Sequence, residues 1–381
     1  MKDNIMIVGP LPEPIQGETV AIQTLVESEL LNDNYIPTTI NTSMGRRSGQ
    51  VGKWTFGKVL RDFKVRKKIK KEFKKRKYEI FYISLSQSRF GLLRDLSFIN
   101  FASKKAKKIV THLHGNNLGN IISRMSGFEK IWVNTIFKKI DIGIVLGSQL
   151  SGNYCGLVKD IRVVPNGIQD RFQDKDILSK DKQRSNNEMK IVYLSNLIKE
   201  KGFFNLIQAT LNLLKSNYRI NLKLAGAIYD RNEYENSIKL IKESGYEDKI
   251  KFLGTVRGKD KDNLLLESDL MVLPSNYKVE GLPLSILEGM SAALPIISTN
   301  RGCIPDLIKG NGILMKNGSV DNVEESIKRI YDDNEKIPAM EATSRKLYLE
   351  KYTQDKYIEN LIEVFLSSKN KRYSRGNKGE Y

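Results

Sequence analysis

The stretch "EGLPLSILEGMSAALPIIST" runs from Glu280 to Thr299 and joins two glutamates to an apolar helix and a buried strand. A short apolar run, "DLMVLPS" (269–275), comes before it, and the loop between them holds glycine and proline. The apolar spacing predicts a helix that begins near Ser285, and "PIIST" (295–299) is typical of a fully buried strand. Strand, loop, helix and strand in this order make up the βαβ unit of a parallel sheet.

The same alternation of short apolar runs and helical patterns continues along the whole chain. The runs are continuous rather than alternating, which is typical of parallel strands covered on both faces. The predicted strands lie at 4–9, 79–85, 108–115, 141–148 and 161–167, and at 190–195, 220–226, 249–254, 269–275, 295–299 and 312–315. The predicted helices include 18–31, 58–75, 203–216, 234–244, 285–293 and 320–333. This pattern predicts an α/β protein built from right-handed βαβ units.

The polar stretch "QDRFQDKDILSKDKQRSNNEM" (169–189) interrupts this rhythm, so we expect the link between two domains there. We therefore predict two facing Rossmann-like domains with an interdomain cleft and a C-terminal helix. The predicted segments are an N-terminal domain (1–170), a linker (171–189), a C-terminal domain (190–353), a helix (354–368) and a disordered basic tail (369–381).

The composition excludes several classes of protein. The 381 residues suffice for two ordinary domains, and no apolar run reaches the length of about 18 residues that a membrane span needs. The N-terminus lacks the long apolar segment of a secretory signal. Two distant cysteines favour a reduced, cytoplasmic setting. With only His112 and His114, we expect no metal centre.

The positive charge is concentrated in the first half. The net charge is +14 over residues 1–170 and +5 over residues 171–381, and residues 53–77 alone contribute +11. Val59, Leu60, Phe63, Ile69 and Phe73 lie among these charges in a predicted helix. A basic amphipathic helix suits an anionic membrane surface. Nucleic acid would attract it too, but the chain has no recognisable nucleic-acid-binding signature, so we expect none as a partner. A third possibility is a solvated surface helix.

Small residues end many of the predicted strands. Ligands of open α/β sheets bind beyond the carboxyl ends of the strands. We therefore expect the following strand ends to line the cleft: Gly9, Gly115, Gly147, Ser195, Gly226, Gly254 and Ser275.

The two glutamates of the opening stretch suit a phosphate ester. The start of the helix near Ser285 offers unpaired N–H groups and a partial positive charge, which favour a phosphate. Glu288 lies one turn inside the helix, within reach of a ribose, and Glu280 precedes the helix on the side of a sugar. Capping and solvated glutamates would be the structural alternative.

Six motifs in order resemble the retaining GT-B glycosyltransferases of family 4, over nearly the whole chain. "EGLPLSILEGM" is similar to the E-x7-E signature of that family, and "SAALPIIST" follows it as expected. The other matching segments are "GPLPEPIQGETVAIQTL" (9–25), "HLHG" (112–115), "VVPNGI" (163–168), "VYLSNLIKEKGFFNLIQA" (192–209) and the strand sequences "LKLAG", "KFLGTV" and "LMVLPS".

The resemblance implies roles for particular residues. Lys201 would neutralise the donor diphosphate, and the backbone N–H groups of Leu284 and Ser285 would hold its distal phosphate. Glu288 would bind the ribose, and Glu280 the transferred sugar, next to Gly281. From the N-terminal domain, which would bind the acceptor, His114 and the loop at Gly17 would border the sugar and the phosphate.

Two positions depart from the family pattern. Asn196 stands where the family usually has an arginine, so neutralisation of the phosphates would depend more on Lys201 or on another residue. Ala293 replaces a usual glycine, which we expect to matter for packing only.

The resemblance, together with these patterns, implies a retaining, metal-independent glycosyltransferase of the hexosyltransferase type, without a cofactor. It would move a sugar from a nucleotide-sugar donor, most often a UDP-sugar, to a lipid-linked saccharide in bacterial surface polysaccharide biosynthesis. We expect it in the cytoplasm, peripheral on the inner face of the cell membrane. The alternatives are a nucleotide-sugar epimerase of the same fold and a basic nucleic-acid-binding protein.

Overall fold

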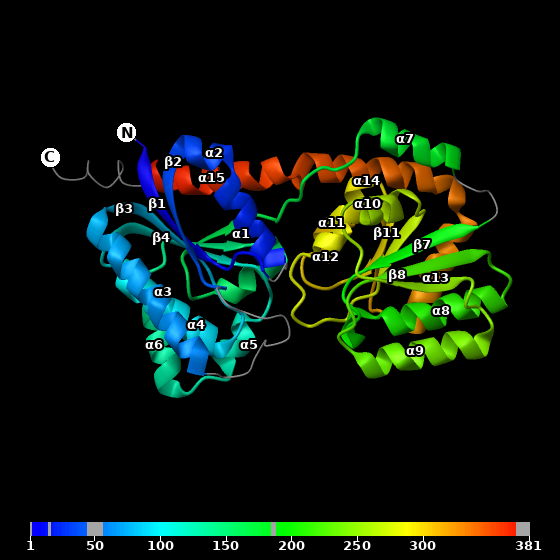
Figure 1. The fold of residues 1–381 in the computed structure, drawn as a ribbon, viewed down its shortest axis with the longest axis horizontal. Helices are drawn as coiled ribbons and strands as arrows, with labels where there is room; N and C mark the ends of the chain where they lie inside the picture. Colours follow the sequence, from blue (N-terminus) through cyan, green and yellow to red (C-terminus); the bar gives the residue numbers. More distant parts are fainter. Residues whose placement is uncertain (1, 14–16, 44–55, 184–187, 371–381) are drawn as a thin grey trace. The chain divides into compact units, whose positions relative to one another are not determined.

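The computed structural model describes residues 2–13, 17–43, 56–183 and 188–370, with the backbone alone at 56–59, 179–183 and 368–370. The chain forms two compact units (Figure 1). The first unit combines Met1–Gly167 with Gln354–Tyr381, and the second is Ile168–Thr353. Each contains one six-stranded parallel sheet, so the predicted α/β class with two Rossmann-like domains is confirmed.

The sheet of the first unit has the strand order β2-β1-β3-β4-β5-β6. All its neighbouring strands are parallel and, except for β2 and β6, almost entirely buried. The strands are β1 (Asp3–Gly9), β2 (Tyr35–Asn41), β3 (Tyr78–Ser84), β4 (Ala106–Leu113), β5 (Ile142–Val145) and β6 (Asp160–Val163).

The helices of the first unit cover both faces of this sheet (Figure 1). They are α1 (Gly17–Glu27), α2 (Glu29–Asn34), α3 (Phe56–Lys75), α4 (Arg89–Ala102), α5 (Leu118–Ser123) and α6 (Gly127–Phe137), joined by the last helix of the chain, α15 (Gln354–Asn370). Tyr357, Leu361 and Phe365 of α15 are buried in one core with Ile5 and Tyr82 of the sheet. The C-terminal helix is therefore part of the first unit.

Strand β2 was not among the predicted strands. Its sequence "YIPTTIN" holds a proline and polar residues, and most of it is only partly buried. It lies at the edge of the sheet. An edge strand tolerates proline because one side of its backbone needs no partner.

The sheet of the second unit has the strand order β12-β11-β10-β7-β8-β9, again all parallel. Its strands are β7 (Met189–Leu194), β8 (Ile220–Ala225), β9 (Ile250–Gly254), β10 (Leu270–Leu273), β11 (Ile296–Thr299) and β12 (Gly312–Met315). Its helices are α7 (Asp174–Gln183), α8 (Phe203–Lys215), α9 (Arg231–Ser244), α10 (Gly258–Leu266), α11 (Leu284–Ser291), α12 (Ile304–Leu307), α13 (Val320–Asp332) and α14 (Ile337–Lys351).

The stretch 171–189, where we expected a linker, carries helix α7 and is grouped with the second unit. Arg345 of α14 binds both carboxylate oxygens of Asp170 at 2.7 and 2.8 Å and the carbonyl of Phe172 at 2.8 Å. This buried guanidinium fixes the start of the stretch, an ordering that apolar periodicity does not reveal. Of the predicted tail 369–381, only the first two residues lie in the described part of the chain, at the end of α15.

The predicted basic helix is α3, and its apolar residues divide into two groups. Val65 and Ile69 are each 1% exposed, and Phe73 packs against Tyr78 and Phe81 of β3. Leu60 and Phe63, in the first half, are exposed. Of the positions predicted on this helix, Val59 lies outside the described side chains. Within the described residues, no helix is long and apolar enough to cross a membrane.

Candidate functional site

The loops after β7 and β10 hold the predicted donor-site residues of the second unit. These two strands are neighbours in the sheet, and the chain leaves them toward opposite edges, β7 to β8 and β10 to β11. Such a reversal of strand order opens a crevice at the carboxyl ends of the strands. Lys201 follows β7, and Glu280 follows β10.

Lys201 and Glu280 form an ion pair in this place. The Nζ of Lys201 lies 2.6 Å from Oε2 of Glu280, and the two side chains are only 12% and 7% exposed. The hydroxyl of Ser275 donates to the same carboxylate oxygen at 2.8 Å. The lysine Nζ also lies 5.2 Å from the centre of the Tyr277 ring, over its face. Glu280 and Tyr277 thus hold the ammonium group, and Ser275 orients the carboxylate of Glu280. A fixed ammonium group is the preorganisation that stabilisation of a developing anion requires.

The backbone around this ion pair is tightly packed. Gly202 has a φ of 79°, and a Cβ there would lie 2.3 Å from the carbonyl oxygen of Pro274. A Cβ on Gly226 would lie 1.8 Å from the carbonyl oxygen of Ser195. Only glycine allows both approaches, so the turn that carries Lys201 lies directly against the neighbouring strand ends.

Helix α11 begins directly after the Glu280 loop. Its first residue is Leu284, its N-cap is Pro283, and no side chain caps it. The carbonyl of Gly281 accepts a hydrogen bond from the N–H of Cys303 at 2.9 Å, which fixes the turn before the helix. Leu284 and Ser285 are half-buried. The first turn of an uncapped helix presents N–H groups to an anion.

Glu288 is held by a residue that the sequence did not reveal. Its Oε1 lies 2.5 Å from the Nζ of Lys261, with the side chains 24% and 20% exposed. Lys261 lies on α10, 27 positions earlier in the chain, within no motif that could have indicated it. Asn196, where the family usually has arginine, is exposed. Lys261 is therefore a second cation beside the predicted donor residues, with a lysine–carboxylate pair of its own.

In the first unit, His114 follows β4 and stacks on His112, with 4.0 Å between the ring centres. Nδ1 of His112 lies 2.8 Å from the hydroxyl of Tyr82. Burial lowers the pKa of His114 to about 4, although the Asn166 amide raises it in part, and burial lowers the pKa of His112 well below its usual range. Both imidazoles are therefore neutral at pH 7.

Some buried polar atoms of the first unit lack a hydrogen-bond partner among the described residues. They are Nε2 of Gln87 and Nε2 of His112, beside the His114 ring and the Asn166 amide, which interact with each other. Gln87 follows β3, and its side chain lies next to Gly115, directly after His114. Buried polar groups are nearly always paired, so this cluster is suited to hydrogen-bond a ligand or water at the carboxyl end of the sheet. The sequence indicated His114 but neither Gln87 nor Asn166.

Gly17 opens α1, at the point where the strand order of the first sheet reverses. Strands β1 and β3 are neighbours, and the chain passes from β1 to β2 on one side and from β3 to β4 on the other. Glu18 accepts a hydrogen bond from the hydroxyl of Ser84, at the end of β3. Residues 14–16 of the predicted glycine loop lie outside the described residues. Gly17 and His114 thus both lie at the carboxyl end of this sheet.

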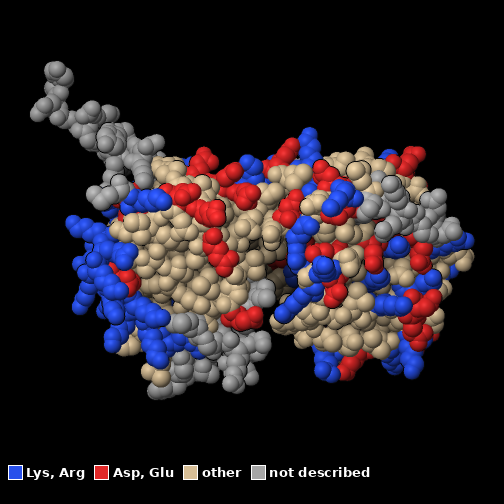
Figure 2. All heavy atoms as spheres, turned by 45° about the horizontal axis from the view of Figure 1, so that its top comes forward, with Lys and Arg blue, Asp and Glu red and all other residues tan. Residues whose placement is uncertain are grey.

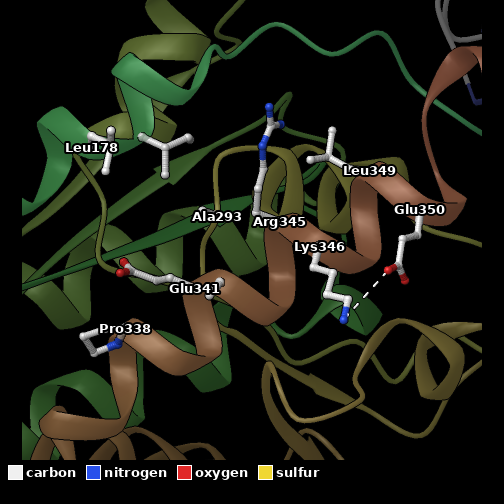
Figure 3. Close-up of a pocket in the computed structure, with 10 residues that line it drawn as sticks. Leu178, Ala293, Pro338, Glu341, Arg345, Lys346, Leu349 and Glu350 are labelled. Carbon is white, nitrogen blue, oxygen red and sulfur yellow. Dashed lines mark ion pairs between the residues drawn. The ribbon is translucent and has the colours of Figure 1, made fainter.

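A cavity of about 520 Å³ lies elsewhere in the second unit, between α7 and α14 (Figure 3). Its lining includes Leu178, Ala293, Pro338 and Leu349, and none of the predicted site residues. Ala293 has a φ of 56°, so its backbone is left-handed. Our expectation that this departure matters for packing only was therefore incomplete, because an alanine in this conformation carries strain of about 1 kcal/mol that glycine avoids.

Groups of three or more His, Cys, Asp or Glu side chains that could hold a metal ion do not occur in the described part of the chain. The charges of the predicted donor site are instead arranged as two lysine–carboxylate pairs.

Comparison with known proteins shows which family this chain resembles. Residues 174–347 match the model of the family Glycosyl transferases group 1. N-acetyl-alpha-D-glucosaminyl L-malate synthase of Bacillus anthracis is 29% identical over 269 residues, which cover 68% of this chain and 67% of that protein. A GDP-mannose-dependent phosphatidylinositol monomannoside mannosyltransferase of Corynebacterium glutamicum is 23% identical, over 67% of this chain and 70% of that protein.

Solved structures show the same fold over nearly the entire chain. Alr3699/HepE of Anabaena in complex with UDP and glucose has a TM-score of 0.70 at 17% identity, covering 96% of this chain and 100% of that one. A glycosyltransferase of Rickettsia africae has a TM-score of 0.73 at 15% identity, covering 95% and 98%. Residues 174–347 therefore match the glycosyl transferases group 1, and the chain has the GT-B fold of solved glycosyltransferases, as its motifs predicted.

Proposed function

We propose that this glycosyltransferase transfers a hexose, with retention and without a metal, from a nucleotide-sugar donor to a lipid-linked saccharide of a bacterial surface polysaccharide. The observation that carries the proposal is the buried Lys201–Glu280 pair beside the uncapped start of α11. Departure of a nucleoside diphosphate requires stabilisation of its growing negative charge. An ammonium group and a helix N-terminus together supply that stabilisation.

Each residue would have a separate task. Lys201 would contact the diphosphate, the N–H groups of Leu284 and Ser285 the distal phosphate, and Glu288 the ribose hydroxyls. Glu280 would accept hydrogen bonds from the transferred sugar while it holds Lys201. Because the attacking hydroxyl would approach from the face that the diphosphate leaves, no second catalytic carboxylate is needed.

Lys261 is the candidate to offset the missing arginine at position 196. It brings a second ammonium group into contact with Glu288, 2.5 Å from the carboxylate. A ribose bound by Glu288 would place the adjacent phosphate near the ammonium group of Lys261. Lys261 would thus supply the positive charge that Asn196 lacks.

A UDP-sugar is the donor that we expect. The Anabaena protein of the same fold is described with UDP and glucose. Other relatives are named for GDP-mannose, so donor choice needs a direct comparison of the nucleotides.

We place the acceptor with the first unit, whose sheet ends in neutral groups: His114, Asn166 and Gln87. Saccharide hydroxyls are uncharged donors and acceptors, and such groups match them without the cost of burying an unpaired charge. The ten Lys and Arg residues of α3 would hold the enzyme on the inner face of the anionic cell membrane, where lipid-linked acceptors lie.

The test measures nucleoside diphosphate release from a panel of UDP- and GDP-sugars with short lipid-linked acceptors. Lys201→Ala and Glu288→Ala are compared with Lys199→Ala, which removes a 66%-exposed lysine from the same turn. We expect release with one donor, loss of release in the first two variants, and wild-type release in the control. The anomeric configuration of the product, determined by NMR, tests retention, and chelator treatment tests metal independence.

Other outcomes would overturn specific parts of the proposal. Release that Lys201→Ala leaves intact would reject the donor site, and an inverted product would reject retention. Conversion of the nucleotide sugar without transfer would favour an epimerase. Tight, salt-dependent binding of nucleic acid without any turnover would favour the nucleic-acid-binding alternative.

A further inference from the structure

Six large apolar side chains of the first unit are exposed in the first halves of three helices. Their exposed fractions lie between 37% and 89%, and all are aliphatic or aromatic: Leu60 and Phe63 on α3, Phe90 on α4, and Phe128, Ile131 and Trp132 on α6. Single exposed apolar residues need no explanation, but a contiguous group on a folded protein marks an interaction surface.

Two ion pairs join the three helices at these residues. Arg89 of α4 binds Glu129 of α6, with 2.6 Å between guanidinium and carboxylate, so Phe90 and Phe128 each stand next to a member of the pair. Arg94 of α4 binds Asp62 of α3 at 3.2 Å, directly beside Phe63. The helices lie side by side in Figure 1. The six residues, here called the apolar docking surface, therefore lie on three helices that these ion pairs hold together.

The surroundings of this patch are strongly basic. Helix α3 carries ten Lys and Arg residues against Asp62 and Glu72. Figure 2 shows this charge as a continuous edge of the first unit. Helix α6 adds Lys130, in the turn between Phe128 and Trp132. Apolar residues bordered by cations match an anionic bilayer, whose headgroups attract the charge and whose acyl boundary accepts the rings.

Part of the apolar docking surface lies near the carboxyl end of the sheet of the first unit. Helix α4 begins at Arg89, soon after the carboxyl end of β3 at Ser84, and Gln87 lies between them. Phe90 of the apolar docking surface is therefore near the strand end that carries Gln87.

We propose that the apolar docking surface inserts into the interfacial layer of an anionic lipid bilayer, while the lysines of α3 contact the headgroups. The charge of α3 draws the protein to the anionic headgroups, and the aromatic side chains act as the anchor. Tryptophan and phenylalanine favour this interfacial layer. The inference extends the membrane attachment of the proposed function, and it names the residues that penetrate the bilayer.

Trp132 provides a direct probe, since the chain has only two tryptophans. In a Trp54→Phe variant all tryptophan emission comes from Trp132. We expect a blue shift and quenching by brominated acyl chains with phosphatidylglycerol vesicles, and neither with phosphatidylcholine vesicles. The double variant Phe128→Ser/Ile131→Ser should bind phosphatidylglycerol vesicles at least about tenfold more weakly, because two apolar side chains can no longer be buried in the bilayer. Ile238→Ser, on the 41%-exposed Ile238 of α9 in the second unit, should bind as the wild type does.

Several results would overturn the inference. Vesicle binding with unshifted Trp132 emission, unchanged in the double variant, would mean attachment by charge alone. A blue shift that depends on protein concentration without vesicles would assign the patch to a second copy of the chain. Binding of nucleic acid in preference to vesicles would also reject it. Release of nucleoside diphosphate with a short water-soluble acceptor separates the two proposals, because the double variant should keep it even where vesicle binding is lost.

Discussion

The two units have the same sheet but opposite chemistry at its carboxyl end. In the second unit, Lys201 and Lys261 each bind a glutamate, at 2.6 and 2.5 Å. In the first unit, the corresponding region holds His114 and Asn166, which are uncharged and interact with each other, and the carboxylate of Glu18. The second unit has two lysine–carboxylate pairs at this end, whereas the first unit, apart from Glu18, has neutral donors and acceptors.

Under the proposed function, this difference in charge would match the two ligands, a nucleotide-sugar donor and a saccharide acceptor. A nucleoside diphosphate gains negative charge as it leaves, and preorganised cations stabilise it. A saccharide presents only hydroxyls, for which neutral hydrogen-bonding groups suffice. One fold thus supports both tasks through the residues at its strand ends.

The comparison between the two units is tested most strongly at Lys201, where a substitution should have the largest effect on turnover and stability. Lys201→Met should lower nucleoside diphosphate release by about 10²- to 10³-fold, the loss typical of one removed stabilising donor. It should also lower the free energy of unfolding by about 3 kcal/mol, because Glu280, only 7% exposed on its side chain, keeps a buried charge without its cation.

The double variant Lys201→Met/Glu280→Gln separates these two effects. It should recover most of the lost stability, measured by urea unfolding, but none of the lost turnover. Lys199→Met serves as the surface control. Turnover in Lys201→Met within tenfold of wild type would mean that the charge at this end of the sheet is structural.

The backbone provides a second contrast, between one glycine of each unit. A Cβ on Gly226 would lie 1.8 Å from the carbonyl of Ser195, whereas a Cβ on Gly119 of the first unit meets nothing within 4 Å. Gly226→Ala should therefore lower the free energy of unfolding by about 3 kcal/mol, through forced displacement of the strand end. Gly119→Ala should be neutral or slightly stabilising. Equal effects in urea unfolding would show that the second unit relaxes more easily than its packing indicates.

The sequence predicted the second unit better than the first, for physical reasons. Its strands are continuous apolar runs, and the spacing from Glu280 to Glu288 marks one loop and one helix, so motif and periodicity agree. In the first unit, β2 contains Pro37 and several polar residues because it is an edge strand. Edge strands follow a weaker pattern, so this strand escaped prediction.

Contacts distant in sequence were beyond any local pattern. Lys261 meets Glu288 across 27 positions, and Arg345 meets Asp170 across 175. The left-handed backbone of Ala293 could not be predicted from the local pattern either. The only signal in the sequence was that this alanine stands where the family usually has glycine. The sequence therefore indicated the residues of a motif, but it did not indicate their ion-pair partners, which are close only in the folded chain.

A pH titration tests the neutral end of the comparison. The pKa of His114 falls from 6.5 in the unfolded chain to about 4 in the folded one. Between these values the unfolded chain binds more protons, so stability falls as the pH falls. From pH 7 to pH 5 the loss from His114 is about 2 kcal/mol. Between pH 7 and pH 5, the free energy of unfolding of His114→Gln, measured by urea unfolding, should fall by about that much less than that of the wild type. An equal loss would show that His114 is not held neutral by the fold.

The smallest effect, on the KM for the donor, is expected at Lys261. It tests whether the second lysine–carboxylate pair contributes to donor binding. Lys261 contacts Oε1 of Glu288, so under the proposed function the other carboxylate oxygen would accept the hydrogen bond of a ribose hydroxyl. Lys261→Gln should raise the KM for the donor about threefold, the effect of a partly exposed ion pair, with kcat unchanged. Lys259→Gln, an exposed lysine of the same helix, is the control. A lower KM would mean instead that Lys261 competes with the ribose for Glu288, and the second pair would then be a resting-state contact rather than part of the binding site.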